Sequence, residues 1–359
     1  MLGINVFDFG AKGDGITDDT KAIQSAIDYL ALRGGGKIFF PYTKSGYRVA
    51  SKGIDKIDGK SVRAQLVIPK GDANIELEGE MPCRFLNSYM VRSLEDEKNG
   101  FSPTTFGSLK NDNTFIFSDW ESPEVHNPTE RPWSILAAPE GTIGKGKFST
   151  FNFSIKNLEF RVPLNKDKMY PTQSCVNLQN VSRIHISDSQ FCLNEQVGDT
   201  FLNKELQFNP CHTSGVIASG DQNDNNVLNN VAVQGFKYGF VLGEHVVANY
   251  LYVHNCEEGI TFHDASHIST INHVVAQHNR VIVSTTTTEL YGMEKGPCYV
   301  KIDTLDFESG IGKKPEISVL KYGVSDKENR LHGSLLWHKP CGKQEFPVDG
   351  ASNFKTERF

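Results

Sequence analysis

The sequence predicts an all-β fold, a parallel β-helix (solenoid) with one capping helix at its N-terminus. Three observations predict it. A glycine followed by an apolar run recurs at spacings of 24 and 20 residues, a single amphipathic helix precedes the strands, and a composition with 23 Phe favours sheet and turns over helix. Repeats of this length cannot bury an apolar face alone, so they are expected to stack into coils.

The N-terminal segment predicts a strand, a glycine turn, a helix and a second strand. Residues 4–9 form a short apolar strand, and the glycines that follow mark sharp turns. The helix is expected near residues 18–32, and Gly34 to Gly36 end it before a strand over 37–40. Its apolar face consists of residues at helical spacing, namely Ala22, Ile23, Ala26, Ile27 and Leu30.

Three acidic residues precede this helix, at Asp14, Asp18 and Asp19. We interpret them as turn and cap residues rather than as metal ligands, because Asp is favoured at both kinds of position. Thr17 or Asp18 is expected to cap the helix. Asp18 and Asp19 are also placed favourably against its positive end.

The same segment resembles the N-terminal signature of a known superfamily. From Asn5-Val-Phe-Asp-Phe-Gly10 to Lys37-Ile-Phe-Phe-Pro41 it is similar to the pectate-lyase-like, single-stranded right-handed β-helix proteins. These include polygalacturonase-type glycoside hydrolases, family 55-type glucanases and phage tailspikes. The resemblance covers residues 4–48 and, as a repeat pattern, residues 150–285. It implies a right-handed β-helix whose first coil is covered by the helix, and a protein that handles polysaccharides.

Internal repetition supports the solenoid independently. Gly215, Gly239 and Gly259 each open a similar apolar run, and the run after Arg280 repeats the pattern without its glycine. Second strands are expected between these runs, over 227–233, 249–253 and 268–275. No helical segment separates the strands, which argues against an ordinary βαβ sheet.

We expect a single domain over residues 1–359, in four parts. Residues 84–149 contain a long insertion around Glu121 to Glu130, and long insertions are the usual place for the wall of a binding site. The parts are the cap and first coil (1–48), loop insertions (84–149), regular coils (150–285) and irregular last coils (286–359).

The composition limits the classes of partner that the protein is expected to bind. The net charge of −6 indicates neither a nucleic-acid nor a membrane partner. The sequence shows no signal segment, so localisation stays unknown, and would be extracellular or periplasmic if a leader has been removed. The seven cysteines form no CxxC pair. They predict mostly free, buried thiols, with one or two disulfides left open, and no zinc site follows from them. We expect no cofactor.

Stacking places polar residues on neighbouring coils. With the glycines in register, Glu244 and Asp264 follow adjacent strands, with backbones about 4.8 Å apart. Two carboxylates this close repel when both are ionised, so one is expected to hold a proton. A proton donor beside a carboxylate is what glycosidic cleavage needs. Asp221 lies two coils from Asp264, and this pair could supply the wider separation between carboxyl groups that inverting hydrolases use.

Other side chains complete the candidate site. His245 and His263 flank the two carboxylates and could donate, accept or orient a proton. Trp120 on the insertion could stack against a sugar ring, and Arg280 is the nearby basic residue that could contact substrate. We interpret His267 as a solvated corner residue. A zinc site from His245, His263 and His267 stays open on ligand type.

These observations favour cleavage of a polysaccharide or oligosaccharide by hydrolysis, with Glu244 and Asp264 as the acid and the nucleophile or base. Polygalacturonase-like enzymes carry three aspartates with downstream Gly-His-Gly and Arg-Ile-Lys motifs, and this sequence has neither motif. A polysaccharide lyase with bound Ca²⁺ and Arg280 as its base is one alternative. A non-enzymatic glycan-binding or tailspike-like receptor-binding module is another. A monomer and a homotrimer both stay open.

Overall fold

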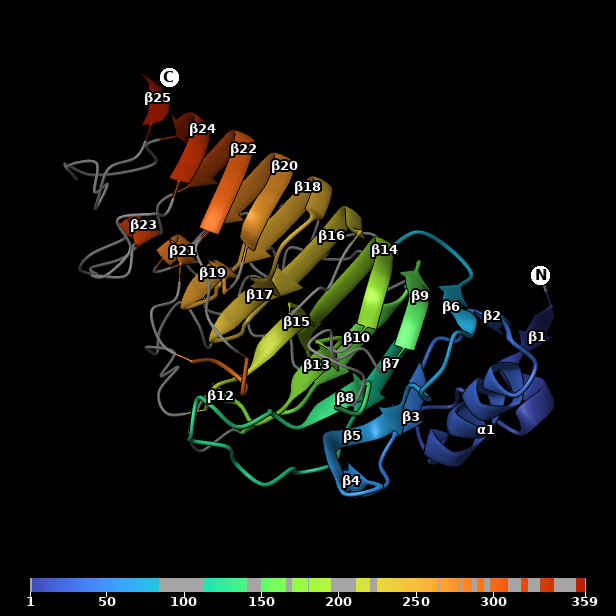
Figure 1. Ribbon diagram of the computed structural model, residues 1–359. Coiled ribbons are helices and arrows are strands. Elements are labelled where there is room, and N and C mark those ends of the chain that lie inside the picture. Colours follow the sequence, from blue (N-terminus) through green and yellow to red (C-terminus); the bar gives the residue numbers. More distant parts are fainter. Residues whose placement is uncertain are drawn as a thin grey trace, which may run out of the picture.

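The strands of the protein stack into an elongated solenoid, with α1 (Thr20–Ala31) at the N-terminal end and β25 (Asn353–Arg358) at the other (Figure 1). The predicted all-β, right-handed parallel β-helix with a capping helix is confirmed. The computed structural model describes residues 2–83, 113–140, 150–165, 170–179, 181–194, 211–219, 225–263, 265–277, 279, 281–285, 289–293, 298–308, 318–321, 330–338 and 353–358.

Two long sheets run side by side along the stack (Figure 1). Sheet A has the order β1 (Gly3–Asn5), β2 (Gly35–Phe40), β6 (Asn74–Gly79), β9 (Thr150–Lys156), β14 (Val181–Leu193), β16 (Asn226–Gln234), β18 (Val246–His254), β20 (Ala265–Gln277), β22 (Cys298–Glu308), β24 (Arg330–His338) and β25. A branch of sheet A contains β3 (Tyr47–Val49), β7 (Phe115–Ser118) and β10 (Glu159–Val162). The last three strands continue the ladder past residue 285, while the division of the chain into four parts stays a prediction.

Sheet B faces sheet A across the core. Its order is β4 (Ile54–Ile57), β5 (Lys60–Val67), β8 (Ser134–Ala137), β13 (Ser174–Asn177), β15 (Ser214–Ala218), β17 (Tyr238–Leu242), β19 (Glu258–Phe262), β21 (Val281–Thr285) and β23 (Ser318–Lys321). All its pairings are parallel except the hairpin of β4 and β5. A second, small antiparallel pair joins β11 (Leu164–Asn165) and β12 (Tyr170–Pro171).

The predicted glycine register is confirmed. Pairing of Ser214 with Tyr238, and of Tyr238 with Glu258, stacks the three glycines that follow these residues. A Cβ on Gly239 would lie 2.4 Å from the Gly259 carbonyl oxygen. Only glycine permits this approach, because the obstructing atom belongs to the backbone of the next coil.

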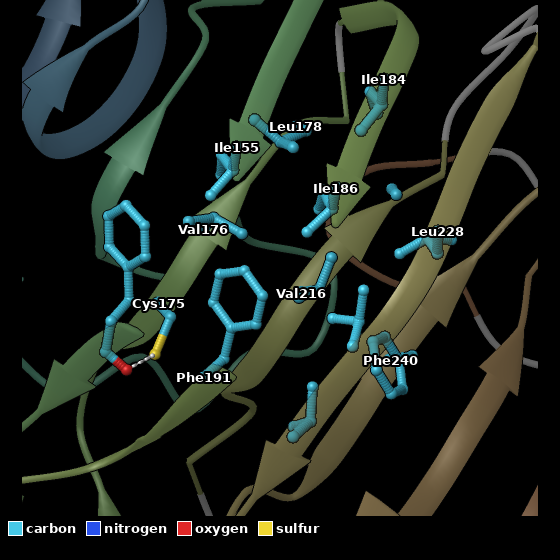
Figure 2. Close-up of a cluster of buried hydrophobic side chains, with 14 of the residues drawn as sticks. Ile155, Cys175, Val176, Leu178, Ile184, Ile186, Phe191, Val216, Leu228 and Phe240 are labelled. Atoms are coloured by element: carbon cyan, nitrogen blue, oxygen red, sulfur yellow. Dashed lines mark hydrogen bonds between the residues drawn. The ribbon is translucent and has the colours of Figure 1, made fainter. Parts of the chain in front are cut away.

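The core lies between the sheets and continues along the stack. Val216 of β15 and Phe240 of β17 pair across sheet B, and Ile186 of β14 pairs with Leu228 of β16 across sheet A. Figure 2 shows these side chains gathered in one cluster. Fully burying a side chain of this size contributes about 1.5–3 kcal/mol, so each added coil stabilises its neighbours.

The N-terminal strand is shorter than predicted. β1 ends at Asn5, and a 3₁₀ turn over Val6–Phe9 replaces the rest of the expected strand. The Asn5 side chain accepts the Phe7 N–H at 2.9 Å, and Gly10 ends the turn in the left-handed region with φ of 95°. A local side-chain cap therefore prevails over the apolar pattern.

α1 begins two residues later than expected, at Thr20, and its N-cap position is Asp19 rather than Thr17 or Asp18. The Asp19 carboxylate instead accepts N–H groups of the preceding turn, from Lys12 at 2.7 Å and Gly13 at 3.0 Å. The Asp18 carboxylate accepts the Thr20 N–H at 3.1 Å. Turn and cap roles for these acidic residues are thereby confirmed, and the buried face of α1 covers the first coil.

Six of the seven cysteines are described, and all six are buried thiols, as predicted. Cys341 lies outside the described residues. Within the described part of the chain, no helix has both the length and the apolar character needed to cross a membrane.

Candidate functional site

Four of the seven predicted site residues can be placed. Glu244, His245 and His263 are described at the C-terminal edge of sheet B, and Trp120 lies on the segment between β7 and β8. The other three, Asp264, Asp221 and Arg280, lie outside the described residues. Their positions stay predictions.

The register that was expected to assemble the site extends past the strand ends. The Gly243 N–H donates to the Ala218 carbonyl at 3.2 Å, and the His263 N–H donates to the Leu242 carbonyl at 3.0 Å. The column that contains Gly243 and His263 therefore forms as predicted. His263 is fully buried in it.

Glu244 lies in the turn from β17 of sheet B to β18 of sheet A and is buried. Its Oε2 atom lies 2.6 Å from Nδ1 of His267, whose side chain is 64% exposed. If Glu244 is ionised and the imidazole is neutral, Nδ1 carries the proton in this pair, because an ionised carboxylate only accepts hydrogen bonds. The other ring nitrogen, Nε2, is then a proton acceptor on an exposed side chain.

His245 belongs to a column of left-handed residues at the starts of sheet A strands, either within the first three residues of the strand (β9, β14) or just before it (β16, β18). Asn152, Arg183, Asn225 and His245 have φ of 56°, 60°, 59° and 52°, and the register of the strands that follow aligns them. This conformation turns the chain into the sheet and presents the His245 ring at the corner. The ring stacks on His267 with centroids 4.6 Å apart and planes 5° from parallel.

His267 reaches this corner because its coil is longer than the one before. Val227 pairs with Val247, and Val247 pairs with Thr270, so the second coil has three more residues than the first. The ladder from β20 to β22 is shifted at the same place, between Ala265 and Ser269. Ser269 holds this longer coil to the preceding one, because its hydroxyl donates to the Gly243 carbonyl at 3.0 Å.

The interpretation of His267 as a solvated corner residue is therefore incomplete. It is exposed, but its ring bonds to Glu244, and the unequal spacing of the repeats was the signal for an excursion here. We name Glu244, His245 and His267 the carboxylate–histidine corner. The zinc site considered from the sequence consisted of His245, His263 and His267. The corner differs from it by containing Glu244 instead of His263.

The corner suits proton transfer better than metal binding. Ligand atoms of all three side chains lie within 4.8 Å of one another. An ion bound by an imidazole nitrogen lies in the plane of the ring. The stacked rings of His245 and His267 have nearly parallel planes, so one ion cannot lie in both. A buried carboxylate that orients an exposed imidazole is instead the arrangement of a general base or acid.

A second polar cluster surrounds a cleft of about 460 Å³ beside the β4–β5 hairpin. Arg63 is at its centre, with ion pairs to Asp55 at 3.2 Å and Glu130 at 2.8 Å. The hairpin turn has positive φ at Asp58 (50°) and Gly59 (75°), as a type I′ turn requires. The cleft is lined by Lys52, Gly53, Asp55, Arg63, Pro123, Glu124, Val125, Glu130 and Trp133.

Sequence reasoning did not find this cleft, although it did expect a binding wall in the insertion. The Asp58-Gly59 pair was the available signal, because Asp-Gly between short strands predicts a hairpin. Behind the cleft, Arg131 donates to the Ser61 carbonyl at 2.9 Å, and burial lowers the pKa of Arg131 to about 10. This guanidinium joins the hairpin to the strand β8.

The predicted sugar-stacking residue Trp120 is half-buried. Its ring packs edge-on against Trp133, with centroids 5.1 Å apart and planes at 86°. Trp133 is 7% exposed and lines the cleft. A Cβ on Gly53 would lie 2.8 Å from Trp120 and 2.9 Å from Trp133, so the absence of a side chain at residue 53 admits both rings.

The cleft and the corner lie at opposite edges of sheet B. The cleft segment contacts residues that precede strands: the Ser122 hydroxyl donates to the Thr172 carbonyl at 3.0 Å, and the His212 N–H donates to the Val125 carbonyl at 3.4 Å. Glu244 instead follows a strand, β17. Because the strands are parallel, these positions fall on different edges.

Comparison with known proteins places the similarity at the N-terminus. Residues 3–59 match the family model described as rhamnogalacturonase A/epimerase, pectate lyase-like. Alginate lyase 7 of Azotobacter vinelandii is 56% identical over 55 residues, which are 15% of this chain and 6% of that protein. Depolymerase 1, capsule KN3-specific, of Klebsiella phage KN3-1 is 63% identical over 30 residues, 8% of this chain and 4% of that protein. The matched segment thus spans a small part of each relative.

The fold extends the similarity to the whole chain. A tailspike protein mutant of E. coli bacteriophage HK620, solved in complex with a pentasaccharide, superimposes with a TM-score of 0.53 at 12% identity. That alignment covers 99% of this chain and 63% of the tailspike. The family match and the shared fold confirm the predicted resemblance of this chain to the pectate lyase-like superfamily of right-handed parallel β-helix proteins.

Proposed function

We propose that this protein acts on a polysaccharide and cleaves it at the carboxylate–histidine corner. The class of substrate is supported by the relatives, which include an alginate lyase and a capsule depolymerase. Those matches cover only 15% and 8% of this chain. The chemistry therefore rests on the corner itself.

The observation that carries the proposal is the contact of 2.6 Å between Glu244 Oε2 and His267 Nδ1. Glu244 is buried, whereas His267 is exposed, so the pair connects a shielded carboxylate to a side chain that substrate can reach. His245, stacked on His267, limits the movement of that ring. This combination provides a positioned proton donor or acceptor.

Hydrolysis is the first candidate reaction. One group of the site gives a proton to the glycosidic oxygen as its bond to the anomeric carbon breaks, and a carboxylate attacks that carbon or activates a water molecule. Glu244 is proposed as one partner and Asp264, on the adjacent coil, as the other. His263 and Asp221 are proposed to support these two groups, and Trp120 and Arg280 to contact the sugar.

Elimination is the second candidate, and a specific observation favours it. With Nδ1 bound to Glu244, Nε2 of His267 can take the proton α to a uronate carboxyl group. The electron pair left on that carbon forms a double bond to C4 as the C4–oxygen bond breaks, and the leaving oxygen takes a proton. His267 replaces Arg280 as the base in this version.

Product analysis on a panel of neutral and uronate polysaccharides separates these reactions. Hydrolysis releases reducing ends without new ultraviolet absorbance, whereas elimination releases reducing ends together with an absorbing unsaturated product. A glycan-binding module releases neither but retains the polysaccharide in affinity electrophoresis. We expect cleavage by the wild type.

Variants at the corner test the site. Glu244→Gln and His267→Ala are each expected to lower the rate by about 100-fold or more, the usual contribution of general acid–base catalysis. Asn249→Ala is the control, because Asn249 belongs to an exposed asparagine ladder on sheet A. A Glu244→Gln protein that cleaves at the wild-type rate would overturn the assignment.

A further inference from the structure

A carboxylate, an imidazole and a thiol converge beside the cleft, from parts of the chain that are far apart in the sequence. Glu124 and His126 come from the segment that forms the cleft wall, and Cys211 precedes β15. One potential ligand atom from each lies within 4.8 Å of the other two. Nε2 of His126 is 3.3 Å from Oε2 of Glu124.

The backbone positions these three side chains. Glu124 and His126 are separated by one residue in an extended segment, so they share a side of it, while Val125 between them is buried. The Val125 carbonyl accepts the His212 N–H at 3.4 Å, which places the neighbouring Cys211 beside the same segment. Cys211 is only 2% exposed, so its sulfur approaches the pair from the protein side.

The distances and donor types suit a tetrahedral zinc-type ion. Ligands bound to zinc at about 2.0–2.2 Å through nitrogen and oxygen are separated by roughly 3.3 Å at tetrahedral angles. The separation of 3.3 Å between His126 and Glu124 matches this value. A thiol in the set favours zinc and its borderline neighbours over Ca²⁺ or Mg²⁺, which take oxygen ligands.

A neighbouring tyrosine orients the carboxylate. The Tyr170 hydroxyl donates to Oε2 of Glu124 at 3.2 Å. Hydrogen bonds of this kind to a ligating carboxylate fix its orientation at metal centres.

We propose that Glu124, His126 and Cys211 bind one divalent ion of the zinc class, with a fourth position for water. The ion fastens the cleft wall to the start of β15 and so shapes the cleft. Binding displaces the Cys211 thiol proton to solvent, because the thiolate is the ligand form. This proposal is independent of the catalytic assignment at the corner.

Titration with Co²⁺ tests it on the whole chain. A thiolate ligand to Co²⁺ produces a near-ultraviolet charge-transfer band, and tetrahedral geometry produces intense visible bands. We expect one equivalent to generate both, and Zn²⁺ to displace it. Cys211→Ser is expected to abolish the charge-transfer band, and His126→Ala, at an exposed residue, to weaken binding at least 10-fold.

Cys83→Ser is the matched control, because Cys83 is another buried thiol and contributes to no such group among the described residues. It should keep the full spectrum. The proposal is overturned if Co²⁺ does not bind, if the bands survive in Cys211→Ser, or if His267→Ala removes them, which would place the ion at the corner. Circular dichroism of each variant verifies that loss of the bands is not loss of fold.

Discussion

The two edges of sheet B carry polar clusters that are built in different ways. At the C-terminal edge, Glu244, His245 and His267 come from adjacent coils. The stacking register places these coils side by side, and three extra residues in one coil bring His267 to Glu244. At the N-terminal edge, Glu124 and His126 come from an insertion that lies across several coils. In a repeat, the spacing of residues in the sequence determines which side chains lie near one another on adjacent coils. In an insertion, the positions of side chains depend on the individual contacts that the segment makes.

The forces that hold the two clusters also differ. The corner depends on the ladder of sheet B at the ends of its strands, where the Gly243 N–H donates to the Ala218 carbonyl at 3.2 Å. The cleft wall depends on individual hydrogen bonds, such as the Tyr291 N–H to the Pro128 carbonyl at 2.7 Å. Displacement of a coil should therefore disturb the corner, and a change in the wall should disturb the cleft alone.

The largest expected effect is that of Gly239→Ala. The new Cβ would lie 2.4 Å from the Gly259 carbonyl oxygen and 3.2 Å from Cys256 Sγ. Because backbone must move to relieve this contact, we expect a loss of about 1–3 kcal/mol in the free energy of unfolding. Chemical denaturation measures the loss, and polysaccharide cleavage should fall with it.

Gly3→Ala is the control, since nothing lies within 4 Å of a Cβ at that position. It should leave the free energy of unfolding within about 0.5 kcal/mol of the wild type. Equal stability of Gly239→Ala and Gly3→Ala would contradict the importance of the glycine column.

An intermediate effect is expected for Arg63→Gln at the cleft. The change removes the ion pairs with Asp55 and Glu130 and one cation from the cleft. If the cleft binds part of the polysaccharide, KM should rise about tenfold, equivalent to about 1.4 kcal/mol. The kcat should change little, because the cleft is at the edge of sheet B opposite the corner. Steady-state kinetics separate the two constants.

Lys156→Gln makes the same change of charge on sheet A, where Lys156 pairs with Glu78 at 3.1 Å. Its KM should equal that of the wild type. A similar rise in both variants would indicate a general effect of net charge rather than a contact in the cleft.

The smallest expected effect concerns Asp18 and acid. Burial raises the pKa of Asp18, but hydrogen bonds from Ser51, Thr20 and Ala50 outweigh it and lower the pKa from 3.8 to about 2. A carboxyl group whose pKa is lowered in the folded state stabilises that state at pH values above the pKa it has in the unfolded chain. That stabilisation is lost as the pH falls from about 4 to about 2.

Asp18→Asn should therefore show a flatter loss of stability than the wild type over this range, as denaturation at several pH values measures. The difference should stay below about 1 kcal/mol, because the group is exposed and screened by solvent. Identical pH profiles would show that the Asp18 charge contributes nothing. Neither sheet B cluster should respond to this change, since Asp18 belongs to the N-terminal turn.

Prediction from the sequence succeeded where a periodic pattern was read. The glycines at 215, 239 and 259 gave the register, and the apolar spacing gave the capping helix, because both depend on local or repeated geometry. It failed over Val6–Phe9, where the Asn5 side chain caps a 3₁₀ turn. It also placed the start of the helix two residues early, because Asp19 occupies the N-cap position, although the Asp18 carboxylate does accept the Thr20 N–H as expected.

The candidate site stays a prediction, but its geometry can be compared with the structure. Register reasoning placed Glu244, His245 and His263 at one edge of sheet B, where the structure also has them. The contact of His267 with Glu244 was missed, because a longer coil carries His267 out of the repeat. The cleft around Arg63 was missed entirely, since its walls come from a hairpin and an insertion that share no period.

By itself, the sequence determined the solenoid, its capping helix and the register of its coils, because periodic apolar residues and glycines allow only one way of stacking. The tertiary structure alone decided which side chains meet at the edges. There, the length of one coil brings His267 to Glu244, and the path of an insertion brings Glu124 and His126 to Cys211. Such contacts join residues with no common period, so only folding of the whole chain defines them.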